Sequence, residues 1–237
     1  MLNMTNQIAL VTGANRGLGR QFTLELIARG AKVYAGARNL ETVDIPGAIP
    51  IQLDITDPKS VAAAAEVAKD VTLLINNAGS STGASLLESD WDNIQLEFDT
   101  HVFGTLAMVR AFAPIIERNG GGTILNVLSA LSWFSIGDAG AYTAAKSAEW
   151  GLTNVLRLNL APRNIRVASL HVGFMDTDMT ANIQAPKVNP TDIARIAIDG
   201  IEADSLEIVA DDTSRKVQKG LAGGVASLYP QLFQTQE

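Results

Sequence analysis

The stretch Thr12-Gly-Ala-Asn-Arg-Gly-Leu-Gly19 connects an apolar run, Gln7–Thr12, to a helical pattern that extends to Ala28. Its three glycines allow backbone N–H groups to approach a phosphate, and the N-terminus of the following helix adds a favourable dipole. The spacing is G-x-x-x-G-x-G and not the commoner G-x-G-x-x-G, so an ordinary glycine-rich turn is the alternative for the loop taken alone. Its position between a strand and a helix favours a pyrophosphate-binding loop.

The rest of the chain alternates short apolar runs with helical patterns, as βαβ units do. Strands are predicted at Gln7–Thr12, Lys32–Ala37, Ile49–Leu53, Thr72–Asn76, Gly122–Ser129, Ile165–His171 and Glu207–Ala210. Helices are predicted at Gly17–Ala28, Pro58–Lys69, within Ser89–Arg118, at Tyr142–Leu160 and from Pro190 onward. Because the apolar runs lack strict alternation, they indicate parallel strands covered on both faces. We therefore expect one α/β domain over residues 1–237.

One long segment, residues 173–189, lacks a regular pattern and follows the sixth predicted strand. Loops of this length without a role are uncommon in compact domains. We expect this segment to cover a substrate site, and a mobile connector is the alternative.

Composition excludes several classes of function. The chain has 237 residues, no cysteine, two histidines and a formal net charge of −7. Without cysteine there is neither a disulfide nor a thiolate nucleophile, and the histidines and acids lack the usual spacing of a metal site. The acidic balance argues against nucleic acid as a partner. No apolar run approaches the roughly 20 residues of a membrane span and no signal peptide is recognisable, so we expect a cytoplasmic protein with no membrane partner.

Tyr142 and Lys146 are four residues apart in a helical pattern, which places both side chains on one face about a turn apart. A nearby ammonium favours the phenolate, so we expect the pKa of Tyr142 to lie below its ordinary value of about 10. Packing and solvation on a helix face would produce the same pair. With the glycine loop and Ser129 upstream, the pair indicates a site of proton transfer.

The end of the second predicted strand indicates which dinucleotide is bound. In NAD-binding folds, an acid about 20 residues after the glycine loop accepts a hydrogen bond from the 2′-hydroxyl of the ribose. Here the strand ends Tyr34-Ala-Gly-Ala-Arg38, without that acid. Arg38, together with Arg16, favours the 2′-phosphate of NADP(H), while NAD(H) remains possible. A solvated charge at a strand end is the alternative for Arg38.

Two short stretches at strand ends complete the candidate cofactor site. Asp54, in Leu53-Asp-Ile-Thr56, is suited to accept a hydrogen bond from an adenine amino group. The small residues of Asn76-Asn-Ala-Gly79 allow the adenosine half to lie close to the backbone. Either stretch alone also fits a turn at the end of a strand.

Together these segments resemble the short-chain dehydrogenase/reductase family. The resemblance covers essentially the whole chain, because T-G-x-x-x-G-x-G, the acid, N-N-A-G, the serine and Y-x-x-x-K occur in order. It implies a Rossmann-like, doubly wound sheet of about seven strands with helices on both faces, and oxidation or reduction at an alcohol or carbonyl carbon. It gives catalytic roles to Ser129, Tyr142 and Lys146. It assigns the cofactor to Thr12, Gly13, Asn15, Arg16, Gly17, Leu18, Gly19, Arg38, Asp54, Ile55, Asn77, Ala78, Gly79, Tyr142, Lys146, Gly173 and Thr177.

The chain departs from the family pattern at two places. His101 stands in Thr100-His-Val-Phe-Gly104, where the family has its catalytic asparagine. A neutral imidazole has one donor where an amide has two, so His101 is either a member of the proton relay or a structural substitute. The second departure is Val172 before Gly173, in place of the usual proline. We expect a somewhat freer loop there, with Thr177 still at the position that holds the nicotinamide carboxamide.

These observations predict an NADPH-dependent oxidoreductase for a small or medium apolar ketone or aldehyde, with Tyr142 as general acid and base. The alternatives are a 3-oxoacyl-carrier-protein reductase, which an acidic chain fits less well, and a non-catalytic NADP(H)-binding sensor. The resemblance also implies a homodimer or homotetramer packed through the long helices. Trp133 and Phe134 are candidates for a wall of the substrate pocket, for the core or for a subunit contact.

Overall fold

The predicted strands all form, within one residue or two of their predicted bounds, in a computed structural model that describes residues 3–233. They are β1 (Ile8–Thr12), β2 (Lys32–Ala37), β3 (Ile49–Gln52), β4 (Leu73–Asn76), β5 (Gly122–Val127), β6 (Ile165–His171) and β7 (Glu207–Val209). Within the described residues every neighbouring pair is parallel, and the order is β3-β2-β1-β4-β5-β6-β7. The order reverses beside β1, and open α/β sheets bind ligands at such a reversal.

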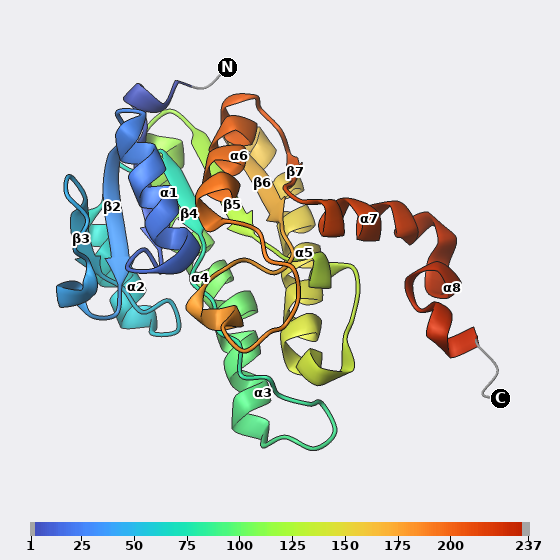
Figure 1. The fold of residues 1–237 in the computed structure, drawn as a ribbon. Coiled ribbons are helices and arrows are strands. Elements are labelled where there is room, and N and C mark those ends of the chain that lie inside the picture. The colour runs from blue at the N-terminus through green and yellow to red at the C-terminus, as the bar shows by residue number, and fades with distance from the viewer. Residues whose placement is uncertain (1–2, 234–237) are drawn as a thin grey trace.

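Apolar side chains point alternately to the two faces of the sheet, and each face has its own layer of helices (Figure 1). Ala9 and Val11 of β1 pack with α1 (Gly17–Ala28) and α6 (Pro190–Glu202). Leu10 packs on the other face with α2 (Pro58–Val67), α4 (Thr105–Arg118) and α5 (Gly140–Leu160). This arrangement confirms the predicted Rossmann-like, doubly wound single domain. Residues 1–2 and 234–237 of the predicted domain lie outside the described residues.

The long central helix is interrupted by a change of helix type. It begins as α3 (Trp91–Phe98), passes through a π-helical segment at Asp99–Gly104 and continues as α4 to Arg118. A π-helical segment inside an α-helix is uncommon and frequently marks a functional site. Pro114 lies inside α4 and does not end it.

Two segments after the sheet differ from a plain connector. The predicted loop 173–189 is closed at its base by a bridge between Met175 and Val188 and contains a short 3₁₀ turn, Asp178–Thr180. The sequence did not predict α7 (Asp212–Gly220) and α8 (Gly224–Leu228), which extend away from the body in Figure 1. In the described part of the chain, none of the helices combines the length and the apolarity that a membrane crossing requires.

Candidate active site

The glycine loop between β1 and α1 has a shape that side chains would not permit. Gly13 and Gly17 have φ values of 63° and 53°, in the left-handed region that favours glycine. A Cβ atom on Gly19 would lie 2.2 Å from the carbonyl oxygen of Gly13. The backbone is therefore open at the N-terminus of α1, and this cradle fits the pyrophosphate of a dinucleotide.

Several residues assigned to the cofactor also hold the ends of β1 and β4 together. The hydroxyl of buried Thr12 accepts hydrogen bonds from the backbone N–H groups of Asn77 and Ala78, each at 2.9 Å. The amide of Asn77 donates to the carbonyl oxygens of Thr12 and Gly13 at 2.9 and 3.3 Å. These bonds fix the glycine loop against the end of β4, so Asn77 supports the cradle from beneath.

The side chains of Leu18 and Ile55 lie in the two cores, so these residues offer only backbone to a cofactor. Asn15 is half-buried in the glycine loop. Asp54 follows β3 and accepts hydrogen bonds from the backbone and hydroxyl of Thr56, which closes a strand-end turn. The carboxylate of Asp211 accepts a hydrogen bond from the backbone N–H of Gly173.

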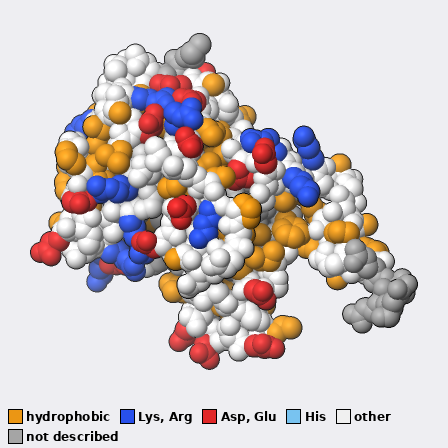
Figure 2. Space-filling model, in the orientation of Figure 1, with side chains coloured by type: hydrophobic (Ala, Val, Ile, Leu, Met, Phe, Trp, Pro, Cys, Tyr) orange, Lys and Arg blue, Asp and Glu red, His pale blue; other side chains and the backbone are white. Residues whose placement is uncertain are grey.

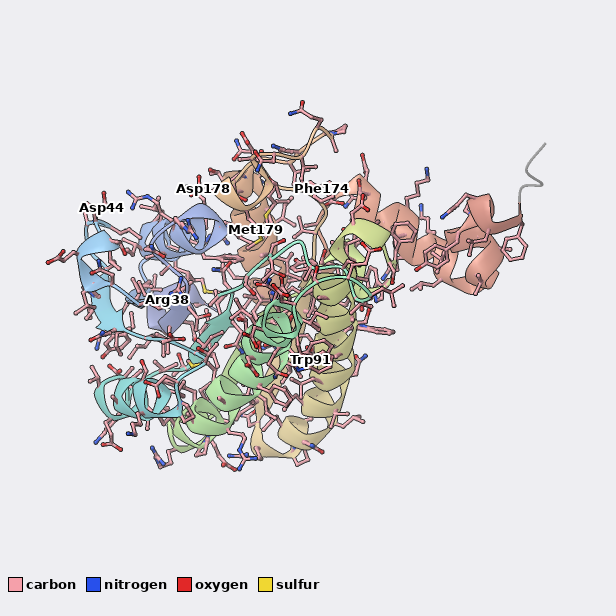
Figure 3. The ribbon with its side chains drawn as sticks, turned by 90° about the horizontal axis from the view of Figure 1, so that it is seen from below. Arg38, Asp44, Trp91, Phe174, Asp178 and Met179 are labelled. Carbon is pink, nitrogen blue, oxygen red and sulfur yellow. The ribbon has the colours of Figure 1, made fainter. Side chains whose placement is uncertain are left out.

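The two arginines predicted to select the cofactor lie on the exposed surface. Arg38 follows β2 and makes none of the ion pairs found among residues 3–233. Arg16 reaches Asp178 of the loop at 3.5 Å, and Thr177 of the same loop lies over Gly17. Figure 3 shows Arg38 and Asp178 as they project from their separate segments. Arg38 is therefore free to meet a 2′-phosphate, whereas Arg16 already has a carboxylate beside it.

Ser129, Tyr142 and Lys146 come together at the carboxyl ends of β5 and β6. Buried Ser129 follows β5, and its hydroxyl accepts a hydrogen bond from the backbone N–H of Leu131. The same hydroxyl lowers the pKa of Tyr142. Tyr142 and Lys146 lie in the first two turns of α5, and the Lys146 Nζ atom is 5.9 Å from the centre of the Tyr142 ring. The predicted three-residue constellation is thus present.

The expected direction of the Tyr142 pKa is wrong in this structure. Burial raises the pKa of Tyr142 above its ordinary value; the ammonium of Lys146 lowers it, and the carboxylate of Glu149 raises it again. The expected lowering rested on Lys146 alone, whereas Glu149 lies 2.7 Å from Lys146 Nζ and opposes it. Burial also lowers the pKa of Lys146, but Glu149, Tyr142 and Glu97 together outweigh burial and leave that pKa raised. Tyr142 is therefore a protonated phenol ready to donate.

His101 lies in the π-helical segment, almost fully buried between two acids that the sequence argument did not single out. Its Nε2 atom is 2.9 Å from the carbonyl oxygen of Ser80 and 3.3 Å from the carboxylate of Glu97. The imidazole meets the Tyr142 ring edge-on, with 5.2 Å between centres. Its Nδ1 atom is 4.0 Å from Glu149. His101 thus lies within the Tyr142–Lys146 site, as the family position implies.

Glu97 is held as a carboxylate although it is fully buried. Burial raises its pKa, but hydrogen bonds from His101, Ser80 and Thr82 outweigh that effect and bring the pKa to about 2. In the sequence, Glu97 stands four residues before His101. Such an i, i+4 pair usually lies on an exposed helix face, so it does not by itself indicate a buried acid.

His171 and Trp133 form a buried layer beneath Ser129. Their rings stack at 3.7 Å between centres, and His171 Nδ1 is 3.3 Å from the Ser129 carbonyl oxygen. Burial lowers the pKa of His171 to about 4, so its ring is neutral at pH 7. Trp133 is therefore a core residue and not a pocket wall. Phe134 is half-buried and stacks on Tyr229 from the C-terminal segment.

Comparison with known proteins identifies the family of this chain. The model of the short chain dehydrogenase family matches residues 7–188. A 3-oxoacyl-[acyl-carrier-protein] reductase of Synechocystis is 30% identical, over 79% of this chain and 82% of its own. A trans-4-hydroxycyclohexanecarboxylate dehydrogenase of Sinomonas cyclohexanicum is 32% identical, over 76% of this chain and 77% of its own.

A solved structure agrees over nearly the whole fold. It is a short chain dehydrogenase from Burkholderia cenocepacia in complex with NADP, with a TM-score of 0.94 and 36% identity. The alignment covers 99% of this chain and 100% of the other. The chain therefore belongs to the short-chain dehydrogenase family and is an oxidoreductase of CH–OH and C=O groups.

Proposed function

We propose that the protein is an NADPH-dependent reductase of small or medium apolar ketones and aldehydes, and the corresponding alcohol dehydrogenase in reverse. The observation that carries the proposal is the position of Tyr142, with Ser129 and Lys146, at the same edge of the sheet as the glycine cradle. When bound, the nicotinamide ring supplies or accepts the hydride.

The side chains divide the remaining work. Ser129 donates a hydrogen bond to the substrate oxygen as negative charge develops there. Tyr142 donates its phenolic proton to that oxygen, and in the reverse direction its phenolate accepts the alcohol proton. Lys146 stabilises the phenolate and offers a donor to the nicotinamide ribose. The raised pKa of Tyr142 suits the reductive direction, because reduction begins from the protonated phenol.

NADP(H) is preferred over NAD(H) in this proposal. Arg38 is an exposed cation after β2, where no acid stands to bind a free 2′-hydroxyl. The similar Burkholderia cenocepacia protein was solved with NADP, which supports the same choice. A short chain dehydrogenase/reductase from Burkholderia phymatum that was solved with NAD is 23% identical and shares the fold.

Apolar side chains in the segments that follow β5, β6 and β7 favour an apolar substrate. Phe174 and half-exposed Met179 belong to the loop 173–189 and are labelled in Figure 3. Phe134 and Tyr229 stack at 5.1 Å between ring centres. The second candidate is a 3-oxoacyl-carrier-protein reductase, which the Synechocystis relative favours. Homodimers or homotetramers and a cytoplasmic location remain predictions.

The test is NADPH oxidation with a panel of ketones, aldehydes and a 3-oxoacyl thioester, measured for the wild-type protein and for Tyr142→Phe. We expect turnover with apolar carbonyls and a loss of at least about 10²-fold in Tyr142→Phe, because a general acid contributes about 10²–10⁴-fold. NADPH affinity should stay within about twofold, since the phenol is not a phosphate ligand. Silence across the panel despite tight NADPH binding would instead identify a sensor.

A further inference from the structure

Three charged or titratable side chains of the site have no role in the chemistry above. Glu97, His101 and Glu149 are 0%, 1% and 2% exposed. Burying two carboxylates is costly unless each has cations and donors around it. Both do: Glu97 accepts from Ser80, Thr82 and His101, and Glu149 accepts from Thr105 and Lys146.

These side chains form a row that begins at Tyr142. Lys146, beside Tyr142, donates to the Oε2 atom of Glu149 at 2.7 Å and to the carbonyl oxygen of Val127 at 2.8 Å. The same Glu149 oxygen lies 4.0 Å from Nδ1 of His101. On the far side of the ring, Nε2 meets the Ser80 carbonyl oxygen at 2.9 Å. Ser80 is half-buried between exposed Gly79 and Ser81, so the row ends next to solvent.

One atom in this row lacks a partner. Nδ1 of His101 is buried and makes no hydrogen bond within residues 3–233, and it faces Glu149 across a gap slightly too long for one. A small rotation of the Glu149 carboxylate closes that gap, because only the Thr105 hydroxyl holds its other oxygen, at 3.1 Å.

The backbone fixes the position of the ring. The π-helical segment carries His101 toward β4, and Gly79 leaves room for the imidazole, since a Cβ there would lie 2.9 Å from its Cε1 atom. A larger residue at position 79 would displace the ring.

We propose that Glu149 and His101 carry protons between Lys146 and the solvent-facing Ser80 loop, so that Tyr142 is reprotonated through side chains of the protein. This inference rests on the proposed function, in which Tyr142 loses one proton per reduction. It names Glu149 as the link and gives Glu97 the task of orienting His101.

Each transfer breaks one bond to hydrogen and forms another. The Tyr142 phenolate takes a proton from the Lys146 ammonium. The Nδ1 proton of the His101 imidazolium passes to the Glu149 carboxylate, and the carboxyl group so formed gives its proton to the Lys146 amine, while Nε2 of His101 keeps its own proton. Solvent at the Ser80 loop then returns one proton to the His101 ring. Before the next turnover the ring either flips or shifts to its other tautomer, so that Nδ1 carries a proton again. Glu97 remains a carboxylate and balances the ring while it holds the extra proton.

The first test is Glu149→Gln, which keeps the shape of the side chain and one acceptor oxygen for Lys146, but whose amide cannot take a proton from His101 and pass it to Lys146. We expect kcat for ketone reduction to fall about 10²-fold, at the low end for general acid–base groups, with NADPH affinity within about twofold. In this variant turnover should also rise with buffer concentration, because protons must arrive from outside. The matched control is Glu207→Gln, since Glu207 stands 3.7 Å from the other histidine, His171.

A double substitution distinguishes a series of carriers from separate effects. If Glu149 and His101 act in one path, Glu149→Gln combined with His101→Gln is no slower than the slower single variant. If the losses of kcat in the two single variants multiply in the double variant, the proposal is wrong. It is also wrong if Glu149→Gln has the kcat of the wild-type protein and its turnover does not depend on buffer concentration. In either case ketone reduction by the wild-type protein would leave the proposed function intact.

A second readout needs no turnover. The chain has two histidines, so ¹⁵N spectra of the ring nitrogens resolve into His101 and His171. We expect Glu149→Gln to change the Nδ1 signal of His101 and to leave that of His171 unchanged. An unchanged His101 signal would show that Glu149 and the ring do not exchange a proton, and the path would be wrong even if the protein reduces ketones.

Discussion

His171 is a buried neutral ring whose protonation favours the unfolded chain. Its pKa is about 4 in the folded protein, against about 6.5 in an unfolded chain. Between these values the unfolded state binds more protons, so stability falls as pH drops from about 6.5 to 4. The shift corresponds to about 3 kcal/mol over that window.

Urea unfolding at pH 7 and at pH 4.5 measures this loss, and His171→Gln should remove most of it. Glu97 contributes in a lower window, because its folded pKa is lowered to about 2 and its stabilisation disappears only as pH falls from about 4.5. An equal pH dependence in the variant and the wild-type protein would show that other groups cause the loss.

Arg38 provides a prediction about the choice of cofactor. Arg38→Asp should move the ratio of kcat/KM for NADPH over NADH toward NADH by about 10²-fold, because a carboxylate repels the 2′-phosphate and accepts the 2′-hydroxyl. Steady-state kinetics with both cofactors measures the ratio. Arg110→Asp is the control, since Arg110 is an exposed arginine on α4. If the ratio stays unchanged, another group recognises the phosphate.

Residue types and spacing could predict Ser129, Tyr142 and Lys146, because these three act at fixed positions in the chain. They could not predict Glu149 or Glu97. Lys146 and Glu149 are three residues apart, a spacing that on most helices is an exposed ion pair of small effect. Only the packing of α3 against α5 buries both acids and reverses the expected direction of the Tyr142 pKa.

At the scale of elements, the π-helical segment determines where His101 lies. Gly104 closes this segment against Ile55, and a Cβ there would meet the Ile55 side chain at 2.9 Å and the Asp99 carbonyl oxygen at 3.1 Å. Gly104→Ala should therefore destabilise the fold by about 1–3 kcal/mol, as overpacking of a core does. It should also lower kcat, because His101 moves with the segment. Urea unfolding and turnover are the two measurements.

Gly151→Ala is the control for that substitution, because nothing lies within 4 Å of a Cβ at this exposed position of α5. Alanine also suits a helix interior better than glycine. If Gly104→Ala and Gly151→Ala are both as stable and as active as the wild-type protein, the close packing at Gly104 does not determine where His101 lies.

Most elements followed from apolar periodicity and from start signals such as Pro58 and Pro190. The π-helical segment did not, because one additional residue in a turn barely changes that periodicity. Helix α7 was also missed, since Ser214 is its only buried residue and no apolar stripe marks it. The sequence likewise does not show that Asp178 of the loop 173–189 meets the glycine loop through Arg16.

At the scale of the whole molecule, exposed apolar side chains on α5 predict self-association. Leu158 and Val155 are 76% and 53% exposed, and Phe103 of the π-helical segment is 55% exposed. We expect a particle mass that is a multiple of 25.1 kDa in sedimentation, and its dissociation in Leu158→Asp. A carboxylate introduced into an apolar contact must be desolvated, and the contact also loses the stabilisation that came from burying the leucine side chain.

Val67→Asp is the control, because Val67 is 62% exposed at the end of α2. Dissociation by both variants, or by neither, would place the contact elsewhere. One such place is the C-terminal segment, where Leu221, Val225, Leu232 and Phe233 are exposed. Figure 2 shows hydrophobic side chains gathered where this segment leaves the body.

The contact between Arg16 and Asp178 has a consequence for the rate at which ligands leave. It joins the glycine loop to the loop 173–189, yet its two side chains are 70% and 77% exposed. Such a pair contributes at most about 1 kcal/mol and is screened by salt. The gap between the two loops thus closes only weakly, and added salt opens it. If product release is the rate-limiting step, kcat should be higher at high salt concentration than in dilute buffer.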